Sequence, residues 1–285
     1  MATAIRTTAQ RSEWFESWFD SLYYHKLYAY RDDTEAARFL DTLIAVLEPH
    51  RGARVLDLGC GAGRHATCLA SKGLHVTGID LAPGSIREAK KFERPGLRFR
   101  QHDMRLPFGR NAFDYVFNFF TSFGYFEEPD EHLAVVRNMA TSLRPGGRLV
   151  LDYLNVRYAE ARLTREDVKE IDGITYRLTR WTDARHFFKR IVVEGGAGKP
   201  LEYTERVAKF TLEDFERMFA RHQLSVEEVH GDYRLSPYHS ETSPRMILVA
   251  RKSATGRDTD YLRDRFLRTR LSVSGETPRY DASMN

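Results

Sequence analysis

Three closely spaced glycines stand directly after an apolar run, and residues of this type in this pattern are suited to binding a ligand. Gly59, Gly61 and Gly63 follow "RVLDL" and precede a segment with helical periodicity. Glycine permits backbone angles that other residues resist and lets a ligand contact the main chain directly. A dinucleotide site would have its third glycine at the position of Arg64, so the spacing disfavours a pyrophosphate ligand without excluding it.

Acidic side chains stand at the ends of the next two apolar segments. Asp80 closes the segment 75–81, and Asp103 with Met104 closes the segment 97–104. A carboxylate has only hydrogen-bond acceptors, so Asp80 can accept from both hydroxyls of a ribose and would repel a 2′-phosphate. Asp103 can accept from an adenine amino group while Met104 packs on the ring. These residue types favour an adenosine ligand that needs no phosphate.

Short apolar runs alternate with amphipathic segments between about residues 50 and 155, and these elements must position the ligand-binding residues. The alternation predicts βα units and a parallel sheet. Gly73 is placed to end the helix after the glycine loop, and Pro83 suits the first turn of the next helix. The predicted strands are 53–60, 75–81, 97–104, 113–120 and 148–155, and the predicted helices are 64–73, 83–92 and 130–143.

The pattern changes after Tyr158 to segments rich in β-branched and aromatic residues, separated by turn signals. These segments predict an antiparallel β meander inserted into the α/β framework. A helix with Thr211 as N-cap and Asp214 three residues later follows, and then two closing strands. The predicted meander segments are 168–183, 186–195 and 201–210, the helix is 211–223, and the closing strands are 225–236 and 243–252.

Five motifs in the first half of the chain resemble those of class I S-adenosylmethionine-dependent methyltransferases. They are "VLDLGCGAGR", "VTGIDL", "HDMRLPF", "FDYVFNFFTSFGYF" and "LRPGGRLVLDY", in the family's order over about residues 50–155. The resemblance implies an α/β, Rossmann-like fold with a seven-stranded mixed sheet. It also implies S-adenosyl-L-methionine as cofactor, S-adenosyl-L-homocysteine as product, and no metal.

The resemblance further implies which residues contact this cofactor. Asp57, Gly59 and Gly61 would border the methionine part, Asp80 the ribose, Asp103 with Met104 the adenine, and Asn118 with Phe119 the sulfonium. Cys60, Gly63 and Leu81 complete the predicted cofactor-binding set.

Three acceptor classes are disfavoured by the residues after the strand 113–120, which are Asn118, Phe119, Phe120 and Thr121. Adenine or glutamine N-methylation usually goes with Asn-Pro-Pro-aromatic at this place. Cytosine C5 methylation needs a thiolate there, and both cysteines lie elsewhere. Metal-assisted catechol methylation uses an Asp, whereas Asn118 is a poorer Mg²⁺ ligand.

The segment "YHKLYAYRDDTEA" is similar to the lead-in of small-molecule N-methyltransferases, such as those that act on deoxyamino sugars. Such enzymes also carry extra strands that build the acceptor site and often an oligomer interface. By this resemblance Tyr24 and Tyr28 would close over the cofactor and take part in catalysis. His65 is the third catalytic candidate, because it begins the helix that follows the glycine loop.

Further polar residues are candidates for the acceptor side, although none is decisive. Tyr153 and Asn155 end the strand 148–155, and His239 lies between the last two strands. The arginines considered for an anionic acceptor are Arg180, Arg185 and Arg245.

Composition favours a globular cytoplasmic chain: 42% of residues are hydrophobic and 29% are charged. No apolar run approaches the roughly 18 residues of a membrane span, and the N-terminus lacks a secretory apolar core. The two cysteines, Cys60 and Cys68, are expected to be reduced. The net charge of +4 is spread along the chain, which disfavours a nucleic-acid partner.

Five regions are predicted. They are an N-terminal helical cap over 1–49, containing two aromatic-rich helical segments; a cofactor-binding core over 50–155; inserted strands over 156–210 for the acceptor site or an oligomer interface; a closing helix and strands over 211–252; and a polar tail over 253–285 with one possible helix at 260–271.

Methyl transfer to a small-molecule acceptor is the favoured function, with the acceptor atom (nitrogen, oxygen or carbon) left open. The alternatives are an RNA or protein methyltransferase that docks through the mild basic excess and the arginine-rich tail, and a protein that senses the cofactor without turnover.

Overall fold

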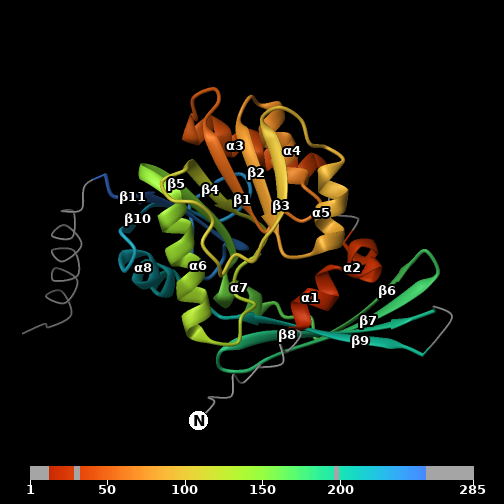
Figure 1. Cartoon of the computed structure of the whole chain (residues 1–285). Helices are drawn as coiled ribbons and strands as arrows, with labels where there is room; N and C mark the ends of the chain where they lie inside the picture. The colour runs from red at the N-terminus through yellow and green to blue at the C-terminus, as the bar shows by residue number, and fades with distance from the viewer. Residues whose placement is uncertain (1–12, 29–32, 196–198, 255–285) are drawn as a thin grey trace, which may run out of the picture.

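The computed structural model describes residues 13–28, 33–195 and 199–254, and within these residues the chain forms two β-sheets. Sheet A has seven strands in the order β10-β11-β5-β4-β1-β2-β3, and sheet B has four in the order β6-β7-β8-β9 (Figure 1). The predicted seven-stranded mixed sheet and the second, antiparallel sheet are thus confirmed. The strands are β1 (Arg54–Leu58), β2 (His75–Asp80), β3 (Leu97–Gln101), β4 (Phe113–Asn118), β5 (Leu143–Leu154), β6 (Glu166–Ile171), β7 (Ile174–Thr182), β8 (His186–Glu194), β9 (Leu201–Ala208), β10 (Leu224–His230) and β11 (Arg245–Lys252).

Strands β1 to β5 run parallel, and β11 lies antiparallel between β5 and β10. The carboxyl ends of the parallel strands therefore share one edge of sheet A, which brings together the loops that follow β1, β2, β3 and β4. Ligands of open α/β sheets bind at this edge.

Helices cover both faces of sheet A, which explains why strands such as β1 are apolar nearly throughout. Helices α3, α4 and α5 pack on one face around Val55, Phe117 and Val150. Helices α6 and α8 pack on the other face around Leu56 and Leu149. In the described part of the chain the helices are α1 (Trp14–Phe19), α2 (Leu22–Leu27), α3 (Asp33–Leu47), α4 (Arg64–Ser71), α5 (Pro83–Lys90), α6 (Pro129–Ser142), α7 (Val156–Ala161) and α8 (Leu212–Ala220).

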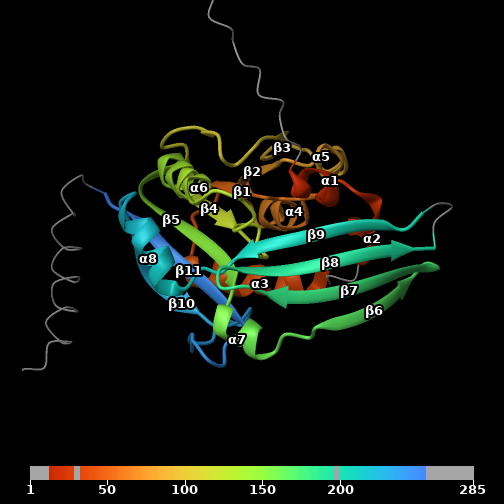
Figure 2. The same ribbon diagram turned by 90° about the horizontal axis from the view of Figure 1, so that it is seen from below.

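Sheet B extends beneath the carboxyl edge of sheet A, and α1 and α2 lie between the two sheets (Figures 1 and 2). Trp18 of α1 and Leu27 of α2 are fully buried against an apolar face of sheet B that includes Tyr176, Leu178 and Ile191. The inserted sheet therefore has its own small core, and that core fixes the N-terminal helices close to the loops of sheet A.

Several element boundaries differ from the sequence predictions. Three helices, not two, occupy the described residues before β1. Strand β3 ends at Gln101, so Asp103 and Met104 lie in the following loop and not in the strand. The segment 144–147, which lies between the predicted helix 130–143 and the predicted strand 148–155, belongs to β5. A register shift against β4 accommodates the left-handed Gly146 (φ +78°) within the strand.

The predicted cap of α8 is confirmed: Thr211 and Asp214 form a reciprocal capping box. The predicted helix at 260–271 and residues 29–32 of the N-terminal lead-in lie outside the described residues. Among the residues that are described, no helix combines the length and hydrophobicity needed to cross a bilayer.

Candidate active site

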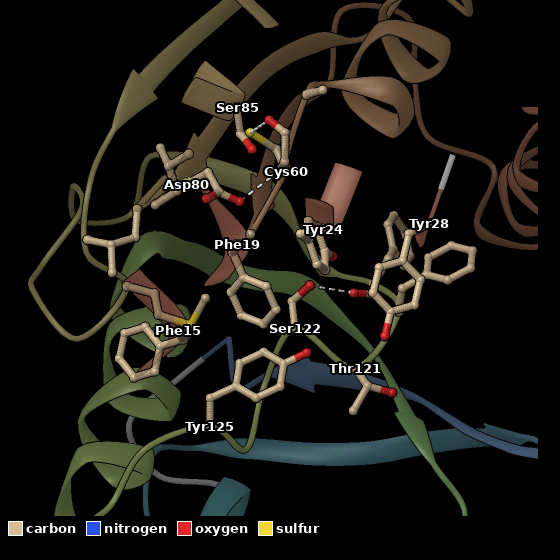
Figure 3. Close-up of a pocket in the computed structure, with 18 of the residues that line it drawn as sticks. Phe15, Phe19, Tyr24, Tyr28, Cys60, Asp80, Ser85, Thr121, Ser122 and Tyr125 are labelled. Atoms are coloured by element: carbon tan, nitrogen blue, oxygen red, sulfur yellow. Dashed lines mark hydrogen bonds between the residues drawn. The ribbon is translucent and has the colours of Figure 1, made fainter. Parts of the chain in front are cut away.

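A cavity of about 640 Å³ lies at the carboxyl edge of sheet A. Its walls come from the loops after β1, β2, β3 and β4, from α1 and α2, and from β9 of sheet B. Figure 3 shows Cys60 and Asp80 on the sheet A side and the rings of Phe15, Phe19 and Tyr24 facing them from the helices. The cavity thus has a polar side built by the glycine loop and an aromatic side built by α1 and α2.

Asp80 holds the glycine loop in place. Its carboxylate accepts hydrogen bonds from the backbone N–H groups of Gly61 (2.8 Å) and Ala82 (2.9 Å). Burial raises the pKa of Asp80, and these two amides lower it in part. At Gly61, with φ +53°, an added Cβ would meet nothing within 4 Å, so the space beside this backbone is open. A ligand can therefore lie directly on the main chain.

Three predicted cofactor-binding residues, Asp57, Gly63 and Asn118, lie behind the loop and do not line the cavity. Gly63 is the left-handed N-cap of α4, where a Cβ would come within 2.6 Å of the Phe99 ring. Asn118 is fully buried and donates from Nδ2 to the carbonyl of Leu58 at 2.7 Å. These contacts shape the loop from beneath, and direct contact with a cofactor stays a prediction for these residues.

Asp57 is a buried carboxyl group with an unused acceptor. It is 1% exposed, and its Oδ2 has no hydrogen-bond partner. Burial, and secondly the charge of Asp80, raise the pKa of Asp57 to about 7. Since a nearby positive charge would favour its ionised form, this residue suits a site that receives a cation.

The loop after β3 brings Asp103 and Met104 to the cavity, but the Asp103 carboxylate already has a partner. Arg105 Nη2 lies 2.7 Å from Asp103 Oδ2. Arg105 Nη1 lies 3.0 Å from Glu13 Oε1 and 2.6 Å from Glu131 Oε1. One guanidinium therefore joins the N-cap of α1, the loop after β3 and the first turn of α6.

The three predicted catalytic residues, Tyr24, Tyr28 and His65, all line the cavity. Tyr24 packs between aromatic rings, with the Phe19 centroid at 5.0 Å and the Tyr28 centroid at 4.8 Å. His65 is nearly buried against the rings of Phe119 and Phe120. The remaining predicted cofactor-binding residues that line the cavity are Gly59, Cys60, Leu81 and Phe119.

The structure adds Glu205 of β9 to the predicted residues. Glu205 Oε1 accepts from Trp18 Nε1 at 2.7 Å and from the Tyr28 hydroxyl at 3.0 Å, and Lys189 Nζ lies 3.5 Å from Oε2. The carboxylate lines the cavity on the side of sheet B. No sequence signal marks it, because its position depends on how the inserted sheet packs on α1 and α2.

Arg245, considered for an anionic acceptor, does line the cavity, and it is already paired. Its Nη2 lies 2.7 Å from Oδ1 of the fully buried Asp152 and donates to Thr121 Oγ1 at 2.9 Å. Arg180 and Arg185 do not line the cavity, and Arg180 lies 3.6 Å from Asp167.

The other acceptor-side candidates, Tyr153, Asn155 and His239, do not line the cavity. Tyr153 is fully buried and donates from its hydroxyl to the Ala208 carbonyl, which ties β5 to the end of β9. Asn155 donates to the carbonyls of Ser240 and Ser243, each at 2.8 Å, and so closes the loop before β11. His239 of that loop is exposed and does not line the cavity. The polar side chains at the end of β5 therefore bind backbone carbonyls of β9 and of the loop before β11.

Both cysteines are free, and Cys60 is buried. Among the described residues, no three His, Cys, Asp or Glu side chains are grouped as metal ligands.

Comparison with known proteins places this site in a family. Residues 55–147 match the family described as "Methyltransferase domain". The chain is 28% identical to the cypemycin N-terminal methyltransferase of a Streptomyces species, over 74% of this chain and 89% of that protein. It superposes with a TM-score of 0.68 on an S-adenosylmethionine-dependent methyltransferase of Clostridium acetobutylicum, at 18% identity over 81% of this chain and 96% of the other.

A second structural comparison gives a cofactor-bound relative. The S-adenosylmethionine-bound amino pentose methyltransferase CalS10 of Micromonospora echinaspora superposes with a TM-score of 0.61, at 26% identity over 82% of this chain and 98% of that one. The family match covers the glycine loop and the strands that carry it, and the two superpositions cover 81% and 82% of this chain. The chain therefore contains a methyltransferase domain over residues 55–147 and has the fold of S-adenosylmethionine-dependent methyltransferases.

Proposed function

We propose that this methyltransferase acts on the amine of a small molecule that binds between the glycine loop, helices α1 and α2, and β9. One observation carries the proposal: the cavity is bounded opposite the glycine loop by aromatic rings and by the carboxylate of Glu205. Aromatic faces and a carboxylate both attract a cation. A protonated amine is therefore the acceptor that these residues suit best.

The residues present fit the cofactor. The open space beside Gly61 admits a ligand against the main chain, and Asp80 can accept from ribose hydroxyls. Met104 offers an apolar surface at the same cavity, and the unused oxygen of Asp57 lies behind the loop. We assign these residues to cofactor binding, with Tyr24 closing the aromatic side.

When bound, S-adenosylmethionine supplies a methyl group activated by a sulfonium. The protein must exclude water and align an acceptor lone pair with this methyl. Phe15, Phe19 and Tyr125 enclose the space in which the acceptor would lie (Figure 3). The close ring contacts among them, such as Phe19 to Tyr125 at 5.1 Å, fix their positions.

An ammonium has no lone pair, so one proton must leave before transfer. Glu205 is placed to take it: the N–H bond breaks, the proton goes to a Glu205 oxygen, and the nitrogen keeps the electron pair. The lone pair so freed could then bond to the methyl carbon that bound S-adenosylmethionine would supply, with S-adenosylhomocysteine as the leaving group. Trp18 and Tyr28 donate to Oε1 and so hold the carboxylate in one orientation.

The names of two relatives are consistent with a nitrogen acceptor. One is an N-terminal methyltransferase of cypemycin, and the other is an amino pentose methyltransferase. The relative that methylates the N-terminus of cypemycin also suggests a peptide as acceptor, because a peptide N-terminus is an amine. The acceptor test must therefore include a short peptide.

The test is a panel assay for S-adenosylhomocysteine formation. The panel contains amino sugars and other small amines, matched alcohols in which a hydroxyl replaces the amine, a short peptide with a free N-terminus, and RNA. We expect turnover with at least one small amine and none with its matched alcohol, with little dependence on salt. Turnover only with an alcohol, only with the peptide, or only with RNA in a steeply salt-dependent manner would overturn the proposal.

Three expectations from the sequence stay predictions: a cytoplasmic location, a homo-oligomer, and the division of the chain at residues 49, 155, 210 and 252. Light scattering coupled to size-exclusion chromatography tests the second.

A further inference from the structure

A second hollow, of about 450 Å³, lies at the opposite edge of sheet A, and we call it the amino-edge hollow. The parallel strands β4 and β5 begin here, and the antiparallel strand β11 ends here at Lys252. It shares no residue with the active-site cavity. Its walls come from the loop before β4, from α6 and β5, and from the segments after α8 and β11.

Basic side chains dominate this hollow. They are Arg110, Arg137, Arg221, His222 and Lys252, and no Asp or Glu is among the described residues that line it. Four separate segments contribute these groups, so the cluster is assembled by the fold and is not a charged run of sequence. The side chains of Arg110, Arg137 and Arg221 are exposed, so a ligand can reach them.

The three arginines have no carboxylate partner within the described part of the chain. Elsewhere arginines are commonly paired: Arg148 and Arg251 share Glu227, each through Nε. In the hollow, Lys252 Nζ donates only to neutral acceptors, the Leu143 carbonyl at 2.6 Å and Asn111 Oδ1 at 3.0 Å. The positive charge of the hollow is therefore not neutralised by these residues.

The titration behaviour of the lining residues agrees with this arrangement. Burial lowers the pKa of His222, and the charges of Arg137 and Arg221 lower it further. Burial lowers the pKa of Lys252, and Arg110 adds to this. Cations held this close together repel one another, and a bound anion would relieve that repulsion.

Neutral groups complete the lining: the side chains of Thr141, Gln223 and Ser253 all contribute. Guanidinium groups match the oxygens of a phosphate with paired N–H donors, which makes arginine the favoured residue at such sites. The volume falls in the range of about 300–1,000 Å³ that is typical of small-ligand sites. A concave site of this size favours a small anion over an extended polymer.

We propose that the amino-edge hollow binds a small anion that carries two or more phosphate groups, held by Arg110, Arg137 and Arg221. This site lies at the opposite edge of sheet A from the active-site cavity and shares no residue with it. The anion is therefore neither the cofactor nor the acceptor of methyl transfer.

Isothermal titration of the full chain with inorganic pyrophosphate tests the proposal. We expect saturable binding that weakens as NaCl rises. Arg137→Gln and Arg221→Gln should each lower the affinity about tenfold or more, because each loses a charge-assisted contact. Arg157→Gln is the matched control, since Arg157 is exposed and pairs with Glu241 outside the hollow, and it should leave the affinity unchanged.

Two further titrations identify the source of the phosphate groups. A nucleoside diphosphate that binds through the same arginines supports a small phosphorylated ligand. A lack of heat with both pyrophosphate and the nucleoside diphosphate overturns the proposal, and so does equal affinity in the Arg137→Gln/Arg221→Gln double variant. Binding of an RNA oligonucleotide alone also overturns it, in favour of a polymer surface. Unchanged binding of S-adenosylhomocysteine shows that each variant is folded.

Discussion

The carboxylate of Asp80 lies 2.8 Å from the backbone nitrogen of Gly61, so the end of β2 fixes the loop that follows β1. A second bond, from the Ala82 amide at 2.9 Å, fixes the carboxylate itself. One side chain therefore orients the open main chain at Gly61 and keeps further lone pairs for a ligand. A change at Asp80 should therefore alter both the conformation of the loop after β1 and the predicted contact with the ribose.

Asp80→Ala should weaken S-adenosylhomocysteine binding by about 100-fold, because it removes the predicted ribose acceptor and the bond that orients Gly61. Isothermal titration measures the affinity directly. Asp183→Ala is the matched control, since Asp183 is an exposed carboxylate between β7 and β8 that also accepts from two backbone amides, those of Arg185 and His186. An Asp80→Ala protein that binds as tightly as the parent would rule out the ribose assignment.

Glu205→Gln should slow methyl transfer at neutral pH by about 100-fold and leave the affinity for S-adenosylhomocysteine within about twofold. The amide keeps the size of the side chain and can still accept from Trp18, but it cannot take a proton from an ammonium. Single-turnover kinetics with the amine found in the panel assay measures the rate.

Tyr28→Phe should slow methyl transfer less than Glu205→Gln does. It removes one hydrogen bond to Glu205 and leaves the carboxylate, so the rate should fall by a smaller factor, about tenfold. The rate of Glu205→Gln should recover at high pH, where the amine is already neutral and needs no proton acceptor. A Glu205→Gln enzyme that keeps the parent rate at neutral pH, or that stays equally slow at high pH, shows that Glu205 is not the proton acceptor.

Arg105→Met should lower the free energy of unfolding by about 2 kcal/mol, since the carboxylates of Glu13, Asp103 and Glu131 lose the guanidinium they share. Urea unfolding measures the loss. Hydrogen exchange should also show faster opening of α1, because Glu13 is its N-cap.

Arg157→Met is the control for this change, because both Arg157 and its partner Glu241 are largely exposed. It should leave stability unchanged. Equal stability of the Arg105→Met and Arg157→Met proteins would contradict a structural role for the Arg105 network.

Asp57 should make stability fall as the pH rises. Its pKa is about 7 in the folded protein and close to its ordinary value of 3.8 when unfolded, so the folded state holds the proton more tightly. The contribution of Asp57 is therefore fully present below about pH 4 and decreases through pH 7, by up to about 1.4 kcal/mol per pH unit.

Asp57→Asn isolates this contribution because asparagine does not ionise. Urea unfolding at pH 5 and pH 8, without cofactor, should show the variant gaining stability relative to the parent at the higher pH. A stability difference that stays constant between the two pH values would mean that Asp57 titrates at its ordinary pKa.

The parts of this protein that local sequence determines were predictable. The glycine loop, the parallel strands around it and the Thr211 capping box each depend on residues close together in the chain. The second sheet was also predicted, because its strands differ in composition from the α/β core.

The placement of side chains at strand ends was not predictable in the same way. Asn118 ends β4 and Asn155 directly follows β5, yet both side chains donate to backbone carbonyls. Glu205 reaches the cavity only because sheet B packs on Trp18 and Leu27. Such positions depend on contacts between distant segments, and periodicity carries no information about them.

The most direct test of a small amine acceptor uses S-adenosylmethionine with a trideuterated methyl group. The protein and this cofactor are added to a cell extract, which is then separated into small molecules, RNA and protein for mass spectrometry. The account predicts label on the nitrogen of a small molecule, and much slower labelling at neutral pH with Glu205→Gln. Label found only in RNA or protein, or on an oxygen or carbon of a small molecule, would contradict it.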